Sequence, residues 1–325
     1  MASAPATYRR LLFTGATGFV GHHLAPALAE AFPESRRLIL RRRGDLVARA
    51  GWESIDADLL DGAAVEAAIA AFRPDLILHL AAQASVGDSA GAAEATWRIN
   101  FDGALAMGAA CARHAPDATF FYVSSAEVYG LSFRDGPARE DTPLRPANAY
   151  ARSKAAAEAM LGDVLAASTR LLIARPFNHI GPMQDERFAL PSFAAQIAAI
   201  EAGRQSPRLE VGNLDVARDF LDVRDVCAAY IALLRKADAL PRRAAFNVAS
   251  GKAHTLRALL GMLGTMSSRR FDIAVSPARL RESDIPVAAG VGDKLAAATG
   301  WAPRIALEET LHALLDHWRE ATTNR

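Results

Sequence analysis

Tyr150 and Lys154 stand four residues apart at the start of a predicted helix, in the segment NAYARSK. Residues four apart lie on one face of a helix, so the Lys154 ammonium can lie beneath the phenol and lower the pKa of Tyr150 from about 10 toward neutrality. Such a phenol can donate a proton to a carbonyl that receives a hydride, or accept one in reverse. Ser125 follows the preceding predicted strand and is expected to hold the same oxygen. Tyrosine and lysine at this spacing are common by chance. The prediction of a redox site therefore depends on the other motifs found in the same chain.

A second set of residues has the spacing of a phosphate-binding turn. Gly15, Gly18 and Gly21 form a GxxGxxG pattern in TGATGFVG, directly after a predicted strand at 10–14 and before a predicted helix. Glycine suits a tight turn whose backbone approaches a pyrophosphate closely and whose helix packs against the strand. The N-terminus of that helix then faces the anion. The pattern therefore predicts a dinucleotide site, although Pro26 is expected to bend the helix or remove one of its hydrogen bonds.

The end of the second predicted strand bears on the choice of cofactor. In NAD-selective sheets an acidic residue about 20 positions beyond the turn binds the ribose hydroxyls, whereas an arginine there can accept a 2′-phosphate. Arg41 stands in that place and opens the run Arg41–Arg43, which predicts NADPH and leaves NADH possible. The competing interpretation is a solvated surface run, since all but four of the 37 basic residues are arginine. Asp58 and Leu59, after the third predicted strand, are expected to hold the adenine edge.

Alternating strand and helix patterns over the first 175 residues must position these side chains. Short apolar runs alternate with longer amphipathic stretches, which is typical of βαβ units and a parallel sheet buried on both faces. The predicted strands span 10–14, 38–40, 54–56, 76–80, 119–124 and 171–174, and the predicted helices 63–72, 95–114 and 150–167.

The pattern changes after residue 175. We predict a loop to residue 186, helices at 191–202 and 223–235, strands at 209–211 and 245–248, and then short helices and loops to the end. The expected fold class is α/β, a Rossmann-type doubly wound parallel sheet with a smaller α/β substrate-binding domain interleaved at the C-terminal side. The cofactor domain would comprise 1–175 plus about 215–250, and the substrate domain about 176–214 plus 251–325.

The composition excludes several classes of protein. The chain has 37 Lys and Arg against 36 Asp and Glu, so it lacks the basic excess of a nucleic-acid binder and the high charge of a disordered chain. Cys111 and Cys227 lie in apolar stretches, which predicts buried reduced thiols rather than a disulfide or a metal site. No apolar run approaches the roughly 20 residues that cross a bilayer, and the start lacks a signal-peptide pattern. We expect a cytoplasmic protein without nucleic-acid or membrane partners.

These motifs, in this order, resemble one known family, the extended short-chain dehydrogenase/reductases that act on nucleotide sugars. The matching segments cover nearly the whole chain: TGATGFVG, DLILHLAAQ, RINFDGA, VSSAEVYG, NAYARSK, ARPFNHIGP, VGNLDVARDFLDVRDV, FNVASG and TGWAPRIALEETL. Within the family, ARPFNHIGPMQ and LEVGNLDVARDFLDVRDV are most similar to the members that reduce the C4 ketone of GDP-4-keto-6-deoxy-D-mannose to GDP-D-rhamnose. The resemblance thus implies a GDP-sugar substrate, NAD(P)H as hydride donor and Tyr150 as proton donor.

Carried over position by position, the resemblance implies roles for residues in these motifs. Ser125, Tyr150 and Lys154 are the implied catalytic set, with Asn100 supporting the lysine. The residues implied to hold the cofactor are Gly15, Thr17, Gly18, Phe19, Val20, Gly21, Arg41, Asp58, Leu59, Ala81, Ala82, Gln83, Asn100, Tyr150, Lys154, Pro176 and His179. The residues implied to hold the nucleotide sugar are Ser125, Ala126, Glu127, Asn178, Gln196, Val211, Arg218, Arg279 and Glu282.

The side chains of Arg218, Arg279 and Glu282 are chemically suited to binding a nucleotide sugar. Arg218 and Arg279 can each clamp a phosphate with two hydrogen bonds, and the Glu282 carboxylate can accept hydrogen bonds from guanine. For either arginine the alternative is a surface ion pair.

Glu127 keeps other reactions open and is a possible fourth catalytic residue. In the related GDP-mannose 4,6-dehydratases, a Thr-x-Glu triplet supplies the base that removes the sugar C5 proton, and residues 125–127 preserve its carboxylate. Against a dehydratase, the glycine turn reads GFVG where those enzymes tend to read GQDG, and residues 182–184 replace a Pro-Arg-Arg-Gly-like run. Glu127 is otherwise a partly solvated structural carboxylate. A nucleotide-sugar 4-epimerase is a further alternative, and a non-catalytic cofactor-binding scaffold is disfavoured by the intact catalytic set.

The two helical stretches at 95–114 and 150–167 carry many small side chains. In the family such helices pair as a four-helix bundle between subunits, so the resemblance implies a homodimer. Alanine-rich helices inside a monomer are the alternative.

Overall fold

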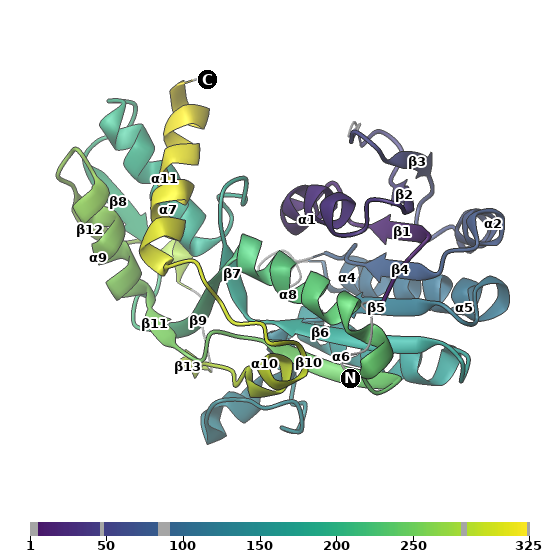
Figure 1. Cartoon of the computed structure of the whole chain (residues 1–325). Helices are drawn as coiled ribbons and strands as arrows, with labels where there is room; N and C mark the ends of the chain where they lie inside the picture. The colour runs from purple at the N-terminus through teal and green to yellow at the C-terminus, as the bar shows by residue number, and fades with distance from the viewer. Residues whose placement is uncertain (1–5, 46–48, 84–91, 281–284, 324–325) are drawn as a thin grey trace.

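A computed structural model of the chain describes residues 6–45, 49–83, 92–280 and 285–323. Its largest sheet has seven strands in the order β10-β6-β5-β4-β1-β2-β3, all of them parallel (Figure 1). These strands are β1 (Arg10–Thr14), β2 (Arg36–Arg41), β3 (Glu53–Asp56), β4 (Leu76–His79), β5 (Thr119–Val123), β6 (Arg170–Pro176) and β10 (Arg243–Val248). Each strand predicted in the first 175 residues is present, with ends that differ by at most two residues.

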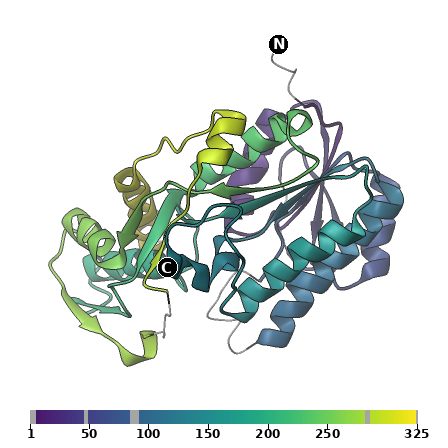
Figure 2. The same cartoon turned by 90° about the horizontal axis from the view of Figure 1, so that it is seen from below.

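Helices cover both faces of this sheet because successive strand residues point to opposite sides. Leu11 and Phe13 pack on one face and Leu12 on the other. One face is covered by α1 (Phe19–Ala31), α8 (Val223–Arg235) and α10 (Asp293–Thr299), and the other by α2 (Gly62–Phe72), α5 (Gly103–His114) and α6 (Ala149–Val164). Figure 2 shows the sheet between these layers, with α5 and α6 side by side. The predicted Rossmann-type architecture is confirmed.

One helix departs from the sequence prediction, and α1 loses a hydrogen bond at Pro26 as predicted. The predicted helix 95–114 is interrupted: α4 (Ala93–Trp97) is followed by a π-helical turn, η1 (Arg98–Asp102), before α5 begins. Helix α1 remains continuous through Pro26, which cannot donate to the carbonyl of His22. The Arg49 guanidinium donates to that carbonyl instead, over 3.4 Å.

A second, smaller unit follows β6. It has a sheet of β11 (Ala253–Thr255), β9 (Ala217–Asp222), β13 (Val287–Ala288) and β7 (Asn178–Ile180), and a pair of β8 (Arg208–Val211) and β12 (Asp272–Val275). Its helices are α7 (Ala189–Glu201), α9 (Leu256–Met266) and α11 (Leu307–Thr323), which share one apolar core. Short 3-10 turns complete the chain: η2 (Ala126–Tyr129), η3 (Leu131–Asp135), η4 (Ala237–Ala239) and η5 (Pro277–Arg279).

The sequence prediction was wrong at several elements of this unit. The predicted loop 176–186 contains β7, and no strand was assigned to β9, because these two short strands pair only with partners distant in sequence. The final stretch, predicted as short helices and loops, also contains β11, β12 and β13, and its last helix, α11, has 17 residues. The chain passes back to the first unit for α8, β10 and α10. The proposed domain limits stay a prediction.

Other expectations concern the cysteines and membranes. Cys111 and Cys227 are both free and buried, as predicted. Among the described residues, no helix has the length and apolar character needed to span a bilayer. The cytoplasmic location expected from the sequence stays a prediction.

Candidate active site

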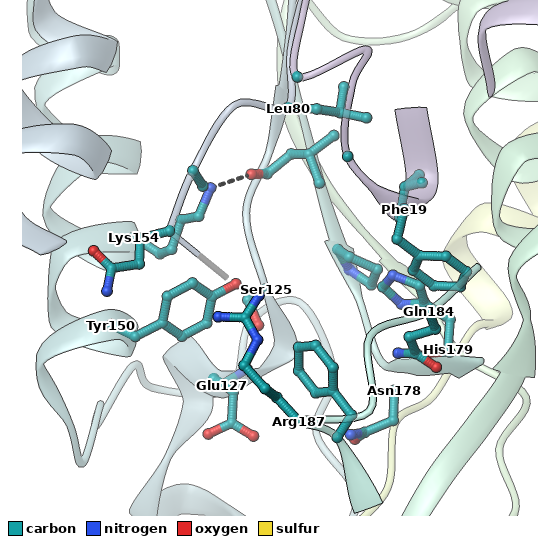
Figure 3. Close-up of a pocket in the computed structure, with 18 of the residues that line it drawn as sticks. Phe19, Leu80, Ser125, Glu127, Tyr150, Lys154, Asn178, His179, Gln184 and Arg187 are labelled. Carbon is teal, nitrogen blue, oxygen red and sulfur yellow. Dashed lines mark hydrogen bonds between the residues drawn. The ribbon is translucent and has the colours of Figure 1, made fainter. Parts of the chain in front are cut away.

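A cavity of about 1340 Å³ lies where the carboxyl ends of the parallel strands face the second unit (Figure 3). Residues that follow β1, β4, β5 and β6 line it, which is where open α/β sheets bind their ligands. Pockets for one small molecule usually hold about 300–1,000 Å³. The cavity is therefore large enough for more than one such ligand.

The glycine turn forms one end of this cavity. Gly15 has φ +82°, and a Cβ there would lie 2.6 Å from the amide nitrogen of Ala81. A Cβ at Gly21 would collide with the carbonyl of Gly15. Gly18 caps α1 without a side-chain hydrogen bond, and the first turn of α1 carries no acidic residue. The free amide groups and the helix dipole thus suit an anion such as a pyrophosphate.

Tyr150 and Ser125 meet in the middle of the cavity. Tyr150 lies in the first turn of α6, Ser125 follows β5, and their side chains are hydrogen-bonded. Burial raises the pKa of Tyr150 to about 12, the Ser125 hydrogen bond acts in the opposite direction, and the nearby charge of Glu127 raises it further. The predicted fall of this pKa toward neutrality was therefore wrong for the protein without ligands, because desolvation is the largest effect. The phenol is a protonated acid at neutral pH.

Lys154 lies one helical turn beyond Tyr150 and is also buried. Its ammonium donates to the carbonyl of Val123 over 2.8 Å and lies 4.9 Å from the centre of the Tyr122 ring (Figure 3 shows the first contact). Burial lowers the pKa of Lys154 to about 7, and the carboxylate of Glu158 opposes this shift. The lysine is thus poised to gain or lose a proton near neutrality.

The start of α6 fixes the side chains of Tyr150 and Lys154. Asn148 has an extended backbone and its side-chain oxygen accepts a hydrogen bond from the amide of Ala151 over 2.8 Å, which ends the preceding loop and begins the helix. Asn100, in the π-helical turn, accepts from the amide of Gln83 over 2.8 Å and donates to Ser153 over 3.0 Å. Asn100 therefore ties the loop after β4 to α6, next to Lys154, and does not itself line the cavity.

The other residues expected to hold a cofactor do line the cavity. They are Gly15, Thr17, Gly18, Phe19, Val20, Gly21, Arg41, Asp58, Leu59, Ala81, Ala82, Gln83, Tyr150, Lys154, Pro176 and His179. The ring of His179 stacks on that of Phe19 with 6.0 Å between centres, which joins β7 to the first turn of α1.

The expected nucleotide-sugar residues divide into two groups. Asn178, Arg218 and Arg279 line the cavity, together with the expected residues 125–127. Gln196 and Val211 are not among its lining residues. Glu282 lies outside the described residues.

The structure explains why Gln196 and Val211 lie apart from the cavity. The Gln196 amide donates to the Glu210 carbonyl over 3.0 Å and accepts from the Glu210 amide over 2.8 Å. It therefore supports β8, in which Val211 is buried.

Arg279 and Arg218 reach the cavity from different elements. Arg279 donates to the Ser192 hydroxyl over 2.8 Å and lies 3.7 Å from the carboxylate of Glu210. Arg218, on β9, donates to the carbonyl of Ala217 over 2.8 Å. Burial lowers the pKa of Arg218, and the charge of Glu127 opposes that effect. Both guanidinium groups line the cavity and are suited to binding phosphate groups.

Glu127 is half-buried at the edge of the cavity. Burial raises the pKa of its carboxyl, while Arg218 and a hydrogen bond with Asn148 lower it. In Figure 3 the carboxylate points away from the Tyr150 hydroxyl.

Several lining residues were not predicted as site residues, including Arg42, Asp45, Asn148, Gln184 and Arg187. Gln184 lies two residues beyond the motif ARPFNHIGP and is buried, with its amide nitrogen donating to the carbonyl of His179 over 3.0 Å. The available signals were the position of Gln184 beside that motif, of Arg42 within the run 41–43 and of Asn148 within NAYARSK. Asp45 and Arg187 lie in turns and loops with no distinctive pattern of their own.

Comparison with known proteins shows which family this chain belongs to. The family described as GDP-mannose 4,6 dehydratase matches residues 12–314. The chain belongs to this family. The GDP-6-deoxy-D-mannose reductase of Pseudomonas aeruginosa is 38% identical over 312 residues, which cover 95% of this chain and 97% of that protein.

Solved structures agree with this assignment. A structure of RMD from Pseudomonas aeruginosa complexed with NADPH matches with a TM-score of 0.81 and 34% identity, covering 96% of this chain and 99% of that one. The UDP-glucose 4-epimerase of Thermus thermophilus, in complex with NAD, has a TM-score of 0.81 and 28% identity, with the same coverage. The resemblance inferred from the sequence is confirmed.

Proposed function

We propose that the protein reduces the C4 ketone of GDP-4-keto-6-deoxy-D-mannose with NADPH to give GDP-D-rhamnose, with Tyr150 as the proton donor. The proposal rests mainly on the 38% identity, over 95% of the chain, to a GDP-6-deoxy-D-mannose reductase. The identity to a GDP-mannose 4,6 dehydratase of Arabidopsis thaliana is lower, at 26%. The coarser statement, that the protein is an NAD(P)-dependent oxidoreductase acting on a GDP-sugar, follows from the same relatives.

The residues present fit a bound nicotinamide dinucleotide. The uncapped N-terminus of α1 and the close-packed glycine turn would hold its pyrophosphate, and Arg41 stands at its adenosine end. The similar reductase structure contains NADPH, and the similar epimerase contains NAD. We therefore assign NADPH as the preferred cofactor and NADH as the second.

The chain's own residues then carry out the proton transfer. When bound, the cofactor supplies a hydride to the ketone carbon. The Ser125 hydroxyl holds the ketone oxygen, and the Tyr150 hydroxyl donates its proton to that oxygen as negative charge develops. Since the pKa of Tyr150 is about 12, the phenol begins as the acid that a reduction needs. The Lys154 ammonium stabilises the tyrosinate, which regains its proton from solvent.

A 4,6-dehydratase is the second candidate, because the Glu127 carboxylate lines the same cavity as Tyr150 and Ser125. Two features favour the reductase. The carboxylate faces Arg218 and Asn148, and residues 182–184 are Pro-Met-Gln where the dehydratases carry a Pro-Arg-Arg-Gly-like run.

The assay that separates these functions compares two substrates. With GDP-4-keto-6-deoxy-D-mannose and NADPH, we expect stoichiometric loss of the nicotinamide absorbance. With GDP-mannose and no added cofactor, we expect no product. Conversion of GDP-mannose alone would instead identify a dehydratase or an epimerase, which regenerates its cofactor in each cycle.

We also propose that two chains pair through α5 and α6. Trp97 on α4 and Leu105 on α5 each expose more than a third of their surface, 36% and 37%, beside the small side chains of these helices. Figure 2 shows α5 and α6 on the outside of the sheet layer. Sedimentation should give a dimeric mass for the protein and a monomeric mass for Leu105→Asp. A monomeric mass for the unaltered protein at micromolar concentration would reject the dimer.

A further inference from the structure

The adenosine end of the cavity carries charges of both signs. Arg41, Arg42 and Asp45 all line it, close to Thr17 of the glycine turn. A site built only to accept a 2′-phosphate would present cations there. A 2′-phosphate site alone therefore does not explain why the acidic Asp45 is among these residues.

A tight turn brings Asp45 to this place. The Asp45 amide donates to the Arg42 carbonyl over 3.1 Å, and Gly44 inside the turn has φ +92°, a conformation that favours glycine. The sequence Arg42-Arg43-Gly44-Asp45 thus folds back over the end of β2. Asp45 is held opposite Arg42 by the backbone rather than by chance contact of two long side chains.

The Arg41 guanidinium already forms hydrogen bonds with neighbouring residues. Its Nε donates to the carboxylate of Asp56 over 2.7 Å, and its Nη1 donates to the Asp45 carbonyl over 2.9 Å. Only 25% of its side chain is exposed. The arginine predicted to bind a 2′-phosphate is therefore neutralised by a carboxylate on β3, and any preference for a phosphate must involve other groups as well.

Asp45 bridges the two walls of this end of the cavity. One carboxylate oxygen accepts a hydrogen bond from the Thr17 hydroxyl over 3.3 Å, and the other lies 3.8 Å from the Arg42 guanidinium. The side chain of Arg42 is 76% exposed, whereas that of Asp45 is 28% exposed. The carboxylate is the more buried of the two and stands between the phosphate-binding turn and the exposed cation.

We propose that Asp45 sets the balance between 2′-phosphorylated and 2′-hydroxylated cofactors at this site. A carboxylate accepts a hydrogen bond from a ribose hydroxyl, but it repels a phosphate that carries about −1.5 to −2 charges at neutral pH. A 2′-phosphate would also have to compete with Asp45 for Arg42. The inference rests on the proposed function only in requiring a nicotinamide dinucleotide, not a particular sugar.

The test measures binding without turnover. The full-length protein is titrated with 2′,5′-ADP and with 5′-AMP in a calorimeter, and the ratio of the two dissociation constants is compared between variants. Asp45→Asn keeps the side-chain shape and removes the charge, so we expect the ratio to shift about tenfold in favour of 2′,5′-ADP. Arg42→Ala should weaken 2′,5′-ADP binding and leave 5′-AMP binding unchanged.

Glu53→Gln is the matched control. It also removes one negative charge, from neighbouring β3, but Glu53 pairs with Arg36 at 2.6 Å and does not line the cavity. We expect no change in the ratio for this variant. An unchanged ratio in Asp45→Asn, or an equal shift in Glu53→Gln, would overturn the role of Asp45.

The outcomes distinguish this inference from the proposed function. If neither nucleotide binds any variant, both the dinucleotide site and the role of Asp45 are rejected. If both nucleotides bind and the ratio shifts as expected, while the keto sugar is not reduced, only the proposed substrate fails.

Discussion

The buried ammonium of Lys154 should lose its proton at an unusually low pH. Burial takes the pKa of Lys154 from its ordinary value of 10.5 to about 7. At about 1.4 kcal/mol for each pH unit, this fall corresponds to about 5 kcal/mol against the charged form in the folded protein. The hydrogen bond to Val123 and the ring of Tyr122 only partly replace the lost water. We therefore expect Lys154 to be about half protonated near pH 7.

The chain is well suited to a direct measurement, because it contains only four lysines, at positions 154, 236, 252 and 294. Lysines labelled with ¹³C at Cε give four signals whose shifts follow protonation in an NMR titration. One signal should titrate with a midpoint near 7, and it should be absent from Lys154→Met. Four signals that do not move below pH 9, or a midpoint near 7 that persists in Lys154→Met, would refute the argument from burial.

The same shift predicts how stability depends on pH. The unfolded lysine holds its proton up to about pH 10.5, whereas the folded one releases it above about 7. The unfolded state thus binds more protons in this window, so this residue's contribution to the unfolding free energy rises as the pH rises from 7 toward 10.5 and is lost as the pH falls through 7. Lys154→Met should therefore be at least as stable as the unaltered protein in urea at pH 7, although it should be inactive.

Three further substitutions test the site and its supports. Tyr150→Phe should lower kcat by about 10²–10⁴, the usual contribution of a general acid, while calorimetry gives unchanged NADPH affinity; a kcat within threefold of the unaltered enzyme would contradict its role. Gly21→Ala should abolish NADPH binding in calorimetry, because its Cβ would collide with the backbone of Gly15 and Ala16; unchanged affinity would show that the turn is looser than described. Glu158→Ala should destabilise the protein to urea by about 3–5 kcal/mol, since it leaves the guanidinium of Arg175 buried without its 2.6 Å partner. A loss below about 1 kcal/mol, the range of exposed ion pairs, would show that water reaches that pair.

The sequence predicted best those helices and strands whose own residues form a clear apolar pattern. The strand at 10–14 and the helix at 223–235 were predicted to the residue, because each is a clear apolar run or amphipathic repeat bounded by polar residues. Strands β7, β9, β11, β12 and β13 were missed, since they are two to six residues long and are stabilised only by pairing with distant segments. The π-helical turn at 98–102 was predicted as part of one continuous helix.

The candidate site divides in a similar way. The glycine turn and the proposed catalytic set could be predicted, because the chemistry expected of them requires their spacing. The pKa of Tyr150 could not, because it depends on how deeply α6 and β5 bury the phenol. Nor could the sequence show that Arg41 pairs with Asp56, or that Gln196 is used by the backbone of Glu210. Such contacts are made between segments whose proximity only the fold establishes.

Hydride transfer from the cofactor to C4 of the sugar can be followed directly with deuterium. NADPH deuterated at the transferable position of its nicotinamide is incubated with the protein and GDP-4-keto-6-deoxy-D-mannose, and the sugar product is analysed by NMR. We expect GDP-D-rhamnose with one deuterium at C4 for each cofactor oxidised, and about 10²–10⁴ times slower labelling with Tyr150→Phe. A product without deuterium at C4, or conversion of the sugar without net oxidation of the cofactor, would contradict the proposed reduction.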